Sequence, residues 1–245
     1  MRIKSGRILP FYFLPMKKTA FCDLQSCAFC RGCLKEWIPA LDANRKTEQY
    51  SKGNQIFKEG DAVKGLYFVV SGKVKVYRKW GEDKSLIMRF VKPGEIFGHR
   101  GMGEKHYPVS AAAIENAVVC FIEYSFFISS LKVNHQYAFD LLQFFAEELQ
   151  ESERKMTYLA HMPVKGRIAY CLVKLKEKFG LDKKGCLNIA ISRNDIASYA
   201  GTTYETAFRT MSEMIDNGMV AFHEKKIILS DISALELCYK EENIF

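Results

Sequence analysis

Four cysteines lie within twelve positions near the N-terminus: Cys22, Cys27, Cys30 and Cys33. The last three follow a C-x2-C-x2-C spacing, whereas the other four cysteines of the chain stand singly. Closely spaced thiols are typical of a metal or iron–sulfur site, because a short loop can wrap a cation or cluster, and residues three apart rarely suit a disulfide to one another. The run therefore predicts the input element of a sensor.

A second stretch whose residues could carry a function runs from Ser192 to Gly218. Ser192 is a good N-cap for one short helix, Gly201 suits a turn, and Thr202 or Thr203 can cap a second helix that Gly218 ends. The expected inward-facing residues are Ile196, Ala197 and Ala200 on the first helix and Ala207, Met211, Met214 and Ile215 on the second. Two helices joined by a glycine-containing turn predict a helix-turn-helix.

The outer face of the second predicted helix carries Thr203 at its start, followed by Tyr204, Glu205, Phe208 and Arg209. In the major groove, Arg209 could read guanine and Glu205 could accept from a cytosine amine, each contact setting ~1–3 kcal/mol of discrimination. The alternative is an exposed i,i+4 ion pair that only stabilises the helix. The helix-turn-helix context favours a DNA-reading role for these five residues.

Composition restricts the class of protein. The 245 residues are 48% hydrophobic and 26% charged, which is typical of a soluble globular protein with one large or two ordinary domains. No stretch reaches ~18 uninterrupted apolar residues, so no membrane partner is expected. The net charge of +8 favours nucleic acid, but residues 164–245 hold twelve Lys/Arg against eleven Asp/Glu, so DNA binding there must rest on pattern.

The N-terminal segment does not have the features of a secretion signal. The apolar stretch Ile8–Leu14 is followed by Lys17 and Lys18 and by no small-x-small cleavage site, so we expect a leader, or a start at Met16. Eight cysteines without a secretion signal predict a reducing, cytoplasmic location. His99 and His106 lie near Glu104, but the spacing fits no hydrolase motif, so no enzyme is predicted.

The middle of the chain predicts an antiparallel β domain followed by a long helix. From residue 47 to 122, short alternating segments are separated by glycine-containing turns, which indicates a β-roll or jelly roll. We divide the chain into a leader and cysteine segment (1–34), a β-roll sensor domain (35–132), a dimerisation helix (133–162) and a winged helix-turn-helix domain (163–245). The predicted fold class is α+β.

The predicted dimerisation helix carries apolar residues in a 3-4-3-4-3 spacing that is typical of a coiled-coil seam. The seam residues are Leu142, Phe145, Leu149, Ser152, Met156 and Leu159. The alternative is a stripe packed on the chain's own β domain. Because the helix leads from one domain into the next, we favour a partner helix in a symmetric homodimer.

This order of elements resembles the CRP/FNR family of bacterial transcription regulators over residues 47–235. The motifs that carry the resemblance are Phe57–Asp61, Leu66–Tyr77, Lys92–Gly98 and Thr203–Arg209. It implies a cyclic-nucleotide-binding-like β-roll, a homodimer on a palindromic DNA operator, and RNA polymerase as a partner. Phe208 stands where FNR-type proteins carry Ser, and Tyr204 where CRP carries Arg, so neither operator transfers to this chain.

The resemblance also bears on the cofactor. The acid and the arginine that hold cAMP in the cyclic-nucleotide branch are missing from Gly98–Arg100 and Val109–Ala111, so cAMP is disfavoured. FNR-type regulators hold a [4Fe–4S] cluster with three N-terminal cysteines and one in the β-roll, which implies Cys27, Cys30, Cys33 and Cys120, with Cys22 spare or replacing Cys33. The alternatives are a structural Zn²⁺, a thiol-redox switch, or a small-molecule effector in the β-roll.

The implied mechanism is an ordering switch that dioxygen or nitric oxide would release. An intact cluster ties the N-terminal segment to the β-roll and biases the dimerisation helix, which sets two recognition helices about one DNA turn, ~34 Å, apart. FNR carries an acidic residue at the position of Ser152 in the seam. Because Ser152 is neutral, we expect this dimer to persist without the cluster.

Overall fold

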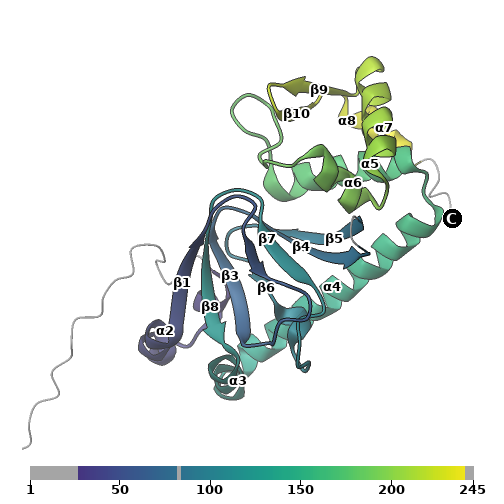
Figure 1. Ribbon diagram of the computed structural model, residues 1–245. Helices are drawn as coiled ribbons and strands as arrows, with labels where there is room; N and C mark the ends of the chain where they lie inside the picture. Colours follow the sequence, from purple (N-terminus) through teal and green to yellow (C-terminus); the bar gives the residue numbers. More distant parts are fainter. Residues whose placement is uncertain (1–26, 82–83, 241–245) are drawn as a thin grey trace, which may run out of the picture.

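A computed structural model describes residues 27–81 and 84–240. A β domain lies beside a long helix that leads into a smaller helical domain with a two-stranded hairpin (Figure 1). The predicted fold class is confirmed. Among the described residues, no helix is both long and apolar enough to cross a membrane.

The β domain consists of two four-stranded sheets packed as a roll, in the strand orders β1-β8-β3-β6 and β2-β7-β4-β5. The strands are β1 (Arg45–Tyr50), β2 (Gln55–Phe57), β3 (Gly65–Ser71), β4 (Val74–Trp80), β5 (Lys84–Val91), β6 (Ile96–Phe97), β7 (Ser110–Ala113) and β8 (Ala117–Glu123). Phe57, Val69 and Phe97 belong to the apolar core between the sheets. Gly72 turns β3 into β4 at φ +76, where a Cβ would stand 2.3 Å from the Asn116 carbonyl oxygen.

Short helices flank the roll before the long one begins. They are α1 (Ala28–Gly32), η1 (Lys35–Trp37), α2 (Ile38–Asn44), η2 (His99–Gly101) and α3 (Tyr124–Val133). Pro39 lies in the first turn of α2, where its missing N–H costs nothing.

The long helix is α4 (His135–His161), and it leads into α5 (Val164–Phe179), which ends at Gly180. The helix-turn-helix consists of α6 (Arg193–Ala200) and α7 (Tyr204–Asp216), followed by the hairpin β9 (Val220–His223) and β10 (Lys226–Leu229) and by α8 (Ile232–Lys240). Between α5 and α6, Cys186 and Leu187 form isolated bridges with Ile228 and Leu181.

The two domains share polar contacts and a core. Lys75 of β4 forms an ion pair with Asp195 of α6 at 2.6 Å. The Phe90 ring of β5 packs edge-on against Tyr199, with centroids 5.1 Å apart. Ile87 and Phe90 belong to the same buried cluster as the helices of the C-terminal domain. The helix-turn-helix is therefore seated on the β4–β5 hairpin.

Candidate functional site

The helix-turn-helix is fixed by local hydrogen bonds that the sequence specifies. Ser192 accepts from the Asp195 backbone N–H, and the Asp195 carboxylate accepts from the Ser192 N–H, which forms a capping box at the start of α6. Gly201 takes φ +62 in the turn, and the Thr203 hydroxyl caps α7 by accepting from the Thr206 N–H. Thr203, the cap, is thus also the first residue of the predicted reading face.

The buried face of α7 sets its outer face. Ala207, Met211 and Met214 are buried as expected, but Ile215 is 37% exposed and Thr210 takes the inward position instead. The prediction that Ile215 faces inward is therefore wrong. The remaining predicted DNA-reading residues, Tyr204, Glu205, Phe208 and Arg209, are all exposed on the N-terminal half of the helix.

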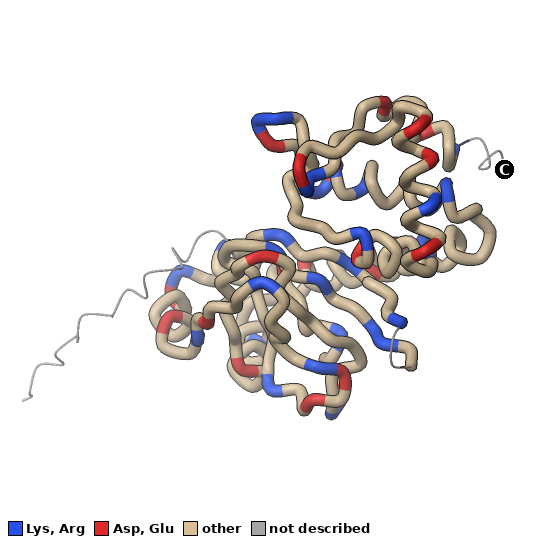
Figure 2. The backbone as a smooth tube through the Cα atoms, turned by 45° about the horizontal axis from the view of Figure 1, so that its top comes forward, with Lys and Arg blue, Asp and Glu red and all other residues tan. Residues whose placement is uncertain are grey.

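Charge is not gathered at this surface. Lys and Arg are spread over both domains with Asp and Glu between them (Figure 2). In the β9–β10 hairpin, the turn residue Glu224 has φ +57 and precedes Lys225 and Lys226. Lys226 forms an ion pair with Asp182 at 2.6 Å, which ties the hairpin to the loop after α5. Charge alone therefore does not mark this face as a nucleic-acid interface.

The cysteine segment is docked in the β-roll. Cys27 caps α1, and its Sγ accepts from the Cys30 backbone N–H at 3.3 Å and donates to the Cys30 Sγ at 3.1 Å. Cys27, Cys30 and Cys120 are 1 to 4% exposed and belong to one apolar cluster. Cys120 pairs across the sheet with Phe68, whose ring stacks on Phe29 between the two N-terminal thiols. Three proposed ligands therefore share one buried region.

The fourth proposed ligand and its alternative lie differently. Cys33 is half-buried and packs against the same cluster; burial, and then the neighbouring Cys27, raise the pKa of its thiol. Cys22 lies outside the described residues. Within residues 27–81 and 84–240, no three His, Cys, Asp or Glu side chains are grouped closely enough to hold a metal ion.

The donor set fits thiolate coordination in residue type, because cysteine thiolates bind both zinc and iron–sulfur clusters. Two thiolates on one tetrahedral zinc ion, with bonds of ~2.3 Å, would stand ~3.8 Å apart. The Cys27 and Cys30 sulfurs lie 3.1 Å apart in a hydrogen bond, so they must separate before either can serve as a metal ligand. The Cys27 and Cys30 side chains are already buried in the apolar interior.

Asn134 connects this cysteine segment to the long helix. Its side-chain oxygen accepts from the Tyr137 N–H and caps α4, and its amide nitrogen donates to the Gly32 carbonyl oxygen at 2.6 Å. The residue is 8% exposed. A Cβ on Gly32 would stand 2.3 Å from the Tyr137 ring, so the ring packs directly on the Gly32 backbone. One buried side chain therefore hydrogen-bonds the last residue of α1 and also caps the start of α4.

The predicted dimer seam divides into two halves. Leu142, Leu149 and Met156 are 61 to 63% exposed, seven residues apart along α4. The other half packs within the same chain. Phe145 packs against the apolar cluster that contains Cys27, Cys30 and Cys120, and Leu159 lies against the Gly201 turn. Ser152 lies between them, and its hydroxyl donates to the Glu148 carbonyl oxygen at 2.8 Å.

Glu148 of α4 faces three basic side chains of the β-roll. Glu148 lies 3.0 Å from Arg89, 3.4 Å from Arg100 and 3.7 Å from His99. Burial raises the pKa of Glu148, but the His99 hydrogen bond and the Arg89 and Arg100 charges outweigh it and lower the pKa to about 2. Burial lowers the pKa of His99, so its ring is neutral at pH 7.

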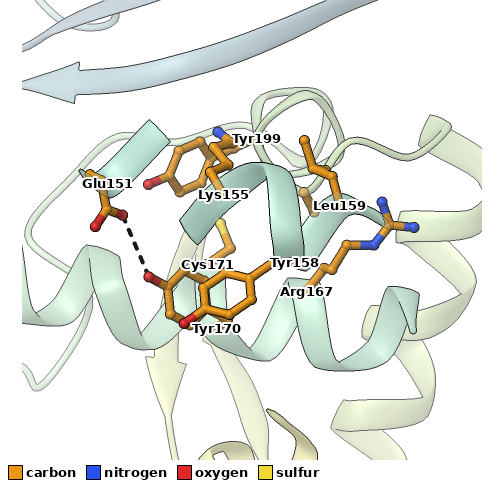
Figure 3. Close-up of a pocket in the computed structure, with 9 residues that line it drawn as sticks. Glu151, Lys155, Tyr158, Leu159, Arg167, Tyr170, Cys171 and Tyr199 are labelled. Carbon is orange, nitrogen blue, oxygen red and sulfur yellow. Dashed lines mark hydrogen bonds between the residues drawn. The ribbon is translucent and has the colours of Figure 1, made fainter. Parts of the chain in front are cut away.

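The far end of α4 lines a small cavity against the DNA-binding domain (Figure 3). Lys155 reaches across it: its amine donates to the Ile87 carbonyl oxygen and lies 3.8 Å from the centre of the Tyr199 ring. The stem of Lys155 is partly exposed, but its amine is enclosed, and this burial lowers its pKa to about 7. Cys171, also at the cavity, is fully buried, which raises the pKa of its thiol to about 12. Lys155 therefore joins α4 to both domains.

A β-roll joined by a long helix to a winged helix-turn-helix defines a DNA-binding regulatory protein. The family model for the cyclic nucleotide-binding domain matches residues 47–134, and that for the Crp-like helix-turn-helix domain matches residues 166–238. The chain belongs to the CRP/FNR family of transcription regulators. Its relatives are transcription regulators and not enzymes, as the sequence predicts.

Individual relatives cover most of the chain. The transcriptional activator protein Anr of Pseudomonas aeruginosa is 28% identical over 92% of this chain and 93% of its own length. The cAMP-activated global transcriptional regulator CRP of Salmonella typhimurium is also 28% identical, over 74% of this chain and 88% of its own. The structure of FixK2 from Bradyrhizobium japonicum has a TM-score of 0.72 and 26% identity over 80% of this chain and 97% of its own.

Proposed function

We propose that this transcription regulator responds to oxygen, nitric oxide or redox state through a [4Fe–4S] cluster. The proposed ligands are Cys27, Cys30, Cys33 and Cys120, with Cys22 spare or replacing Cys33. One observation carries the proposal: Cys27, Cys30 and Cys120 are enclosed in the apolar cluster that also holds Tyr137, in the first turn of α4. A buried thiol trio beside the start of a long helix suits a sensor better than a structural knuckle at the chain end.

A bound cluster would supply a group that dioxygen or nitric oxide degrades or modifies. The protein side of the switch consists of the contacts that hold the cysteine segment. The Ala28 N–H donates to the Gly94 carbonyl oxygen at 2.9 Å, and Asn134 bonds both Gly32 and the first turn of α4. Release of the segment would free the start of α4 and change the orientation of α7.

The exposed half of the seam supports a symmetric homodimer. Leu142, Leu149 and Met156 are too exposed to be explained by packing within one chain. Two copies of α7 would then read a palindromic operator, with its half-sites ~34 Å apart. RNA polymerase as a partner and a cytoplasmic location complete the proposal.

Replacing Cys120 with Ala tests the cluster. Protein purified without oxygen should be brown, with broad absorbance near 400 nm, and the Cys120→Ala variant should lose that absorbance. Cys186→Ala is the matched control, because Cys186 is equally buried but lies in the DNA-binding domain. A colourless anaerobic sample with one zinc ion per chain would contradict the proposal.

A thiol-redox switch is the second candidate, and the 3.1 Å contact between the Cys27 and Cys30 sulfurs favours it. Dioxygen or peroxide would take two electrons and two protons from the thiols as the S–S bond forms. In metal-free protein, mass spectrometry would then find a loss of two hydrogens at this pair, and a reductant would restore the original DNA affinity. Unchanged thiols after oxidation would leave the cluster as the better candidate.

Ser152 leads to a prediction about the oligomer. Its neutral hydroxyl accepts weakly from Arg100 at 3.5 Å and places no charge across the dimer axis. We therefore expect air-exposed, cluster-free protein to sediment as a dimer in analytical ultracentrifugation. Met156→Glu puts a charge in the exposed half of the seam and should give monomer. Wild-type protein that sedimented only as monomer in air would refute a switch acting through helix orientation.

A further inference from the structure

The reading face of α7 presents two aromatic rings beside its polar pair. Tyr204 and Phe208 are 45% and 44% exposed. They lie one helical turn apart, and their rings stack with centroids 6.3 Å apart and an angle of 24° between the planes. Glu205 and Arg209 each follow one of these rings along the helix. An exposed aromatic pair on a binding face indicates an apolar contact with the partner.

The Phe208 ring is contacted by Arg193 of α6, which also contacts the β9–β10 hairpin. The guanidinium carbon of Arg193, the first residue of α6, lies 5.1 Å from the Phe208 ring centre and 5.1 Å from that of Phe222 on β9. The cation therefore lies between the recognition helix and the hairpin. A ring held in this way loses little freedom on binding.

We propose that the stacked Tyr204–Phe208 pair recognises the 5-methyl group of thymine in the major groove, beside the bases that Glu205 and Arg209 read. A phenyl ring has no donor or acceptor, and the thymine methyl is the apolar feature that base pairs present in that groove. Arg193 is a positioning residue that fixes the ring. This inference rests on the proposed DNA-reading role of α7 and names what that face selects.

The experiment compares thymine with uracil, which lacks only the methyl group. Full-length protein purified without oxygen first selects its operator from random duplexes. Each thymine is then replaced by uracil in both half-sites. We expect one or two positions at which the Kd rises about fourfold per half-site, or about 16-fold for both, as befits the loss of one buried methyl group.

Variants assign the effect to the ring. Phe208→Ala should bind thymine and uracil operators equally, and it should fold, because Phe208 is 44% exposed and lies outside the buried core. Ile215→Ala, on the C-terminal half of the same helix, is the matched control and should keep the full discrimination. Arg193→Lys keeps the charge and therefore the salt dependence, but it should reduce the discrimination, because ammonium does not stack between two rings.

Each result decides the inference. Equal wild-type affinity for thymine and uracil operators would overturn methyl recognition, as would a Phe208→Ala variant that still discriminates. In both cases the selected operator would leave DNA reading by Glu205 and Arg209 intact. If the full-length protein selected no sequence, the reading role of α7 would fall together with the inference.

Discussion

Glu148→Gln should destabilise the protein at neutral pH by about 3 kcal/mol and should flatten its loss of stability in acid. The pKa of Glu148 is lowered from 4.5 to about 2 in the folded protein, a shift of about 2.5, and each pKa unit corresponds to ~1.36 kcal/mol. Because the folded pKa is the lower one, this stability is complete above about pH 4.5 and is lost as the pH falls toward 2.

Urea unfolding followed by tryptophan fluorescence at pH 7, 4 and 3 would measure this. The difference between wild type and Glu148→Gln should shrink steadily across that range. Glu147→Gln is the control, because Glu147 is the exposed neighbour on the same helix and should behave like wild type. A Glu148→Gln variant equally destabilised at pH 3 and pH 7 would mean that packing, and not charge, explains the loss.

The large destabilisation expected for Glu148→Gln reflects the number of helices and strands that the ion pairs around Glu148 connect. Glu148 on α4 contacts Arg89 of β5, and Arg89 also reaches Glu95 at 3.2 Å. Glu95 in turn lies 2.9 Å from Lys178 of α5. A chain of alternating charges thus runs from the long helix through the β-roll to the DNA-binding domain.

The elements that can be predicted from the sequence are those marked by residues within the element itself, such as helix caps and turn glycines. The capping residues Ser192 and Thr203 and the turn at Gly201 identify the helix-turn-helix, because each acts within four residues of itself. Strands without apolar alternation were missed: β1 reads Arg-Lys-Thr-Glu-Gln-Tyr, and β7 reads Ser-Ala-Ala-Ala. Their places come from pairing with β8 and β4, which no local pattern reports.

Contacts between distant residues account for the rest. Asn134 directly precedes a helix and could have been recognised as an N-cap, but its bond to Gly32 spans 102 positions. The six-residue seam is similarly ambiguous, since spacing alone does not say which apolar residues meet a partner. Phe145 and Leu159 pack within their own chain, because the apolar cluster that contains the cysteines lies beside Phe145 and Gly201 lies beside Leu159.

Phe29→Ala should release the cysteine segment. Phe29 is 1% exposed, and its ring lies 5.3 to 5.5 Å from those of Phe68, Phe127 and Tyr137, which come from β3, α3 and α4. Burial of a phenyl ring of this kind contributes about 3–5 kcal/mol. The ring joins the cysteine segment to β3, α3 and α4, so its loss should favour a state in which the segment has left the β-roll.

The reaction rate of the thiols would measure that release. In metal-free protein, alkylation of Cys27 and Cys30 requires local opening, because both side chains are at most 4% exposed. Phe29→Ala should therefore speed their alkylation at least about a hundredfold, as read by mass spectrometry of labelled peptides. Cys171, 1% exposed in α5, is an internal control that should keep its wild-type rate.

The Asn134→Asp variant separates the docking of the cysteine segment from the effect of that segment on DNA affinity. Aspartate still accepts from the Tyr137 N–H and caps α4, but it loses the donor to the Gly32 carbonyl oxygen. We expect thiol protection near wild type, because Phe29 remains seated, but a smaller change in operator affinity when the cysteines are alkylated. Unchanged coupling in Asn134→Asp would assign the signal to the apolar packing of the segment against the first turn of α4, which includes the contact of Phe29 with Tyr137.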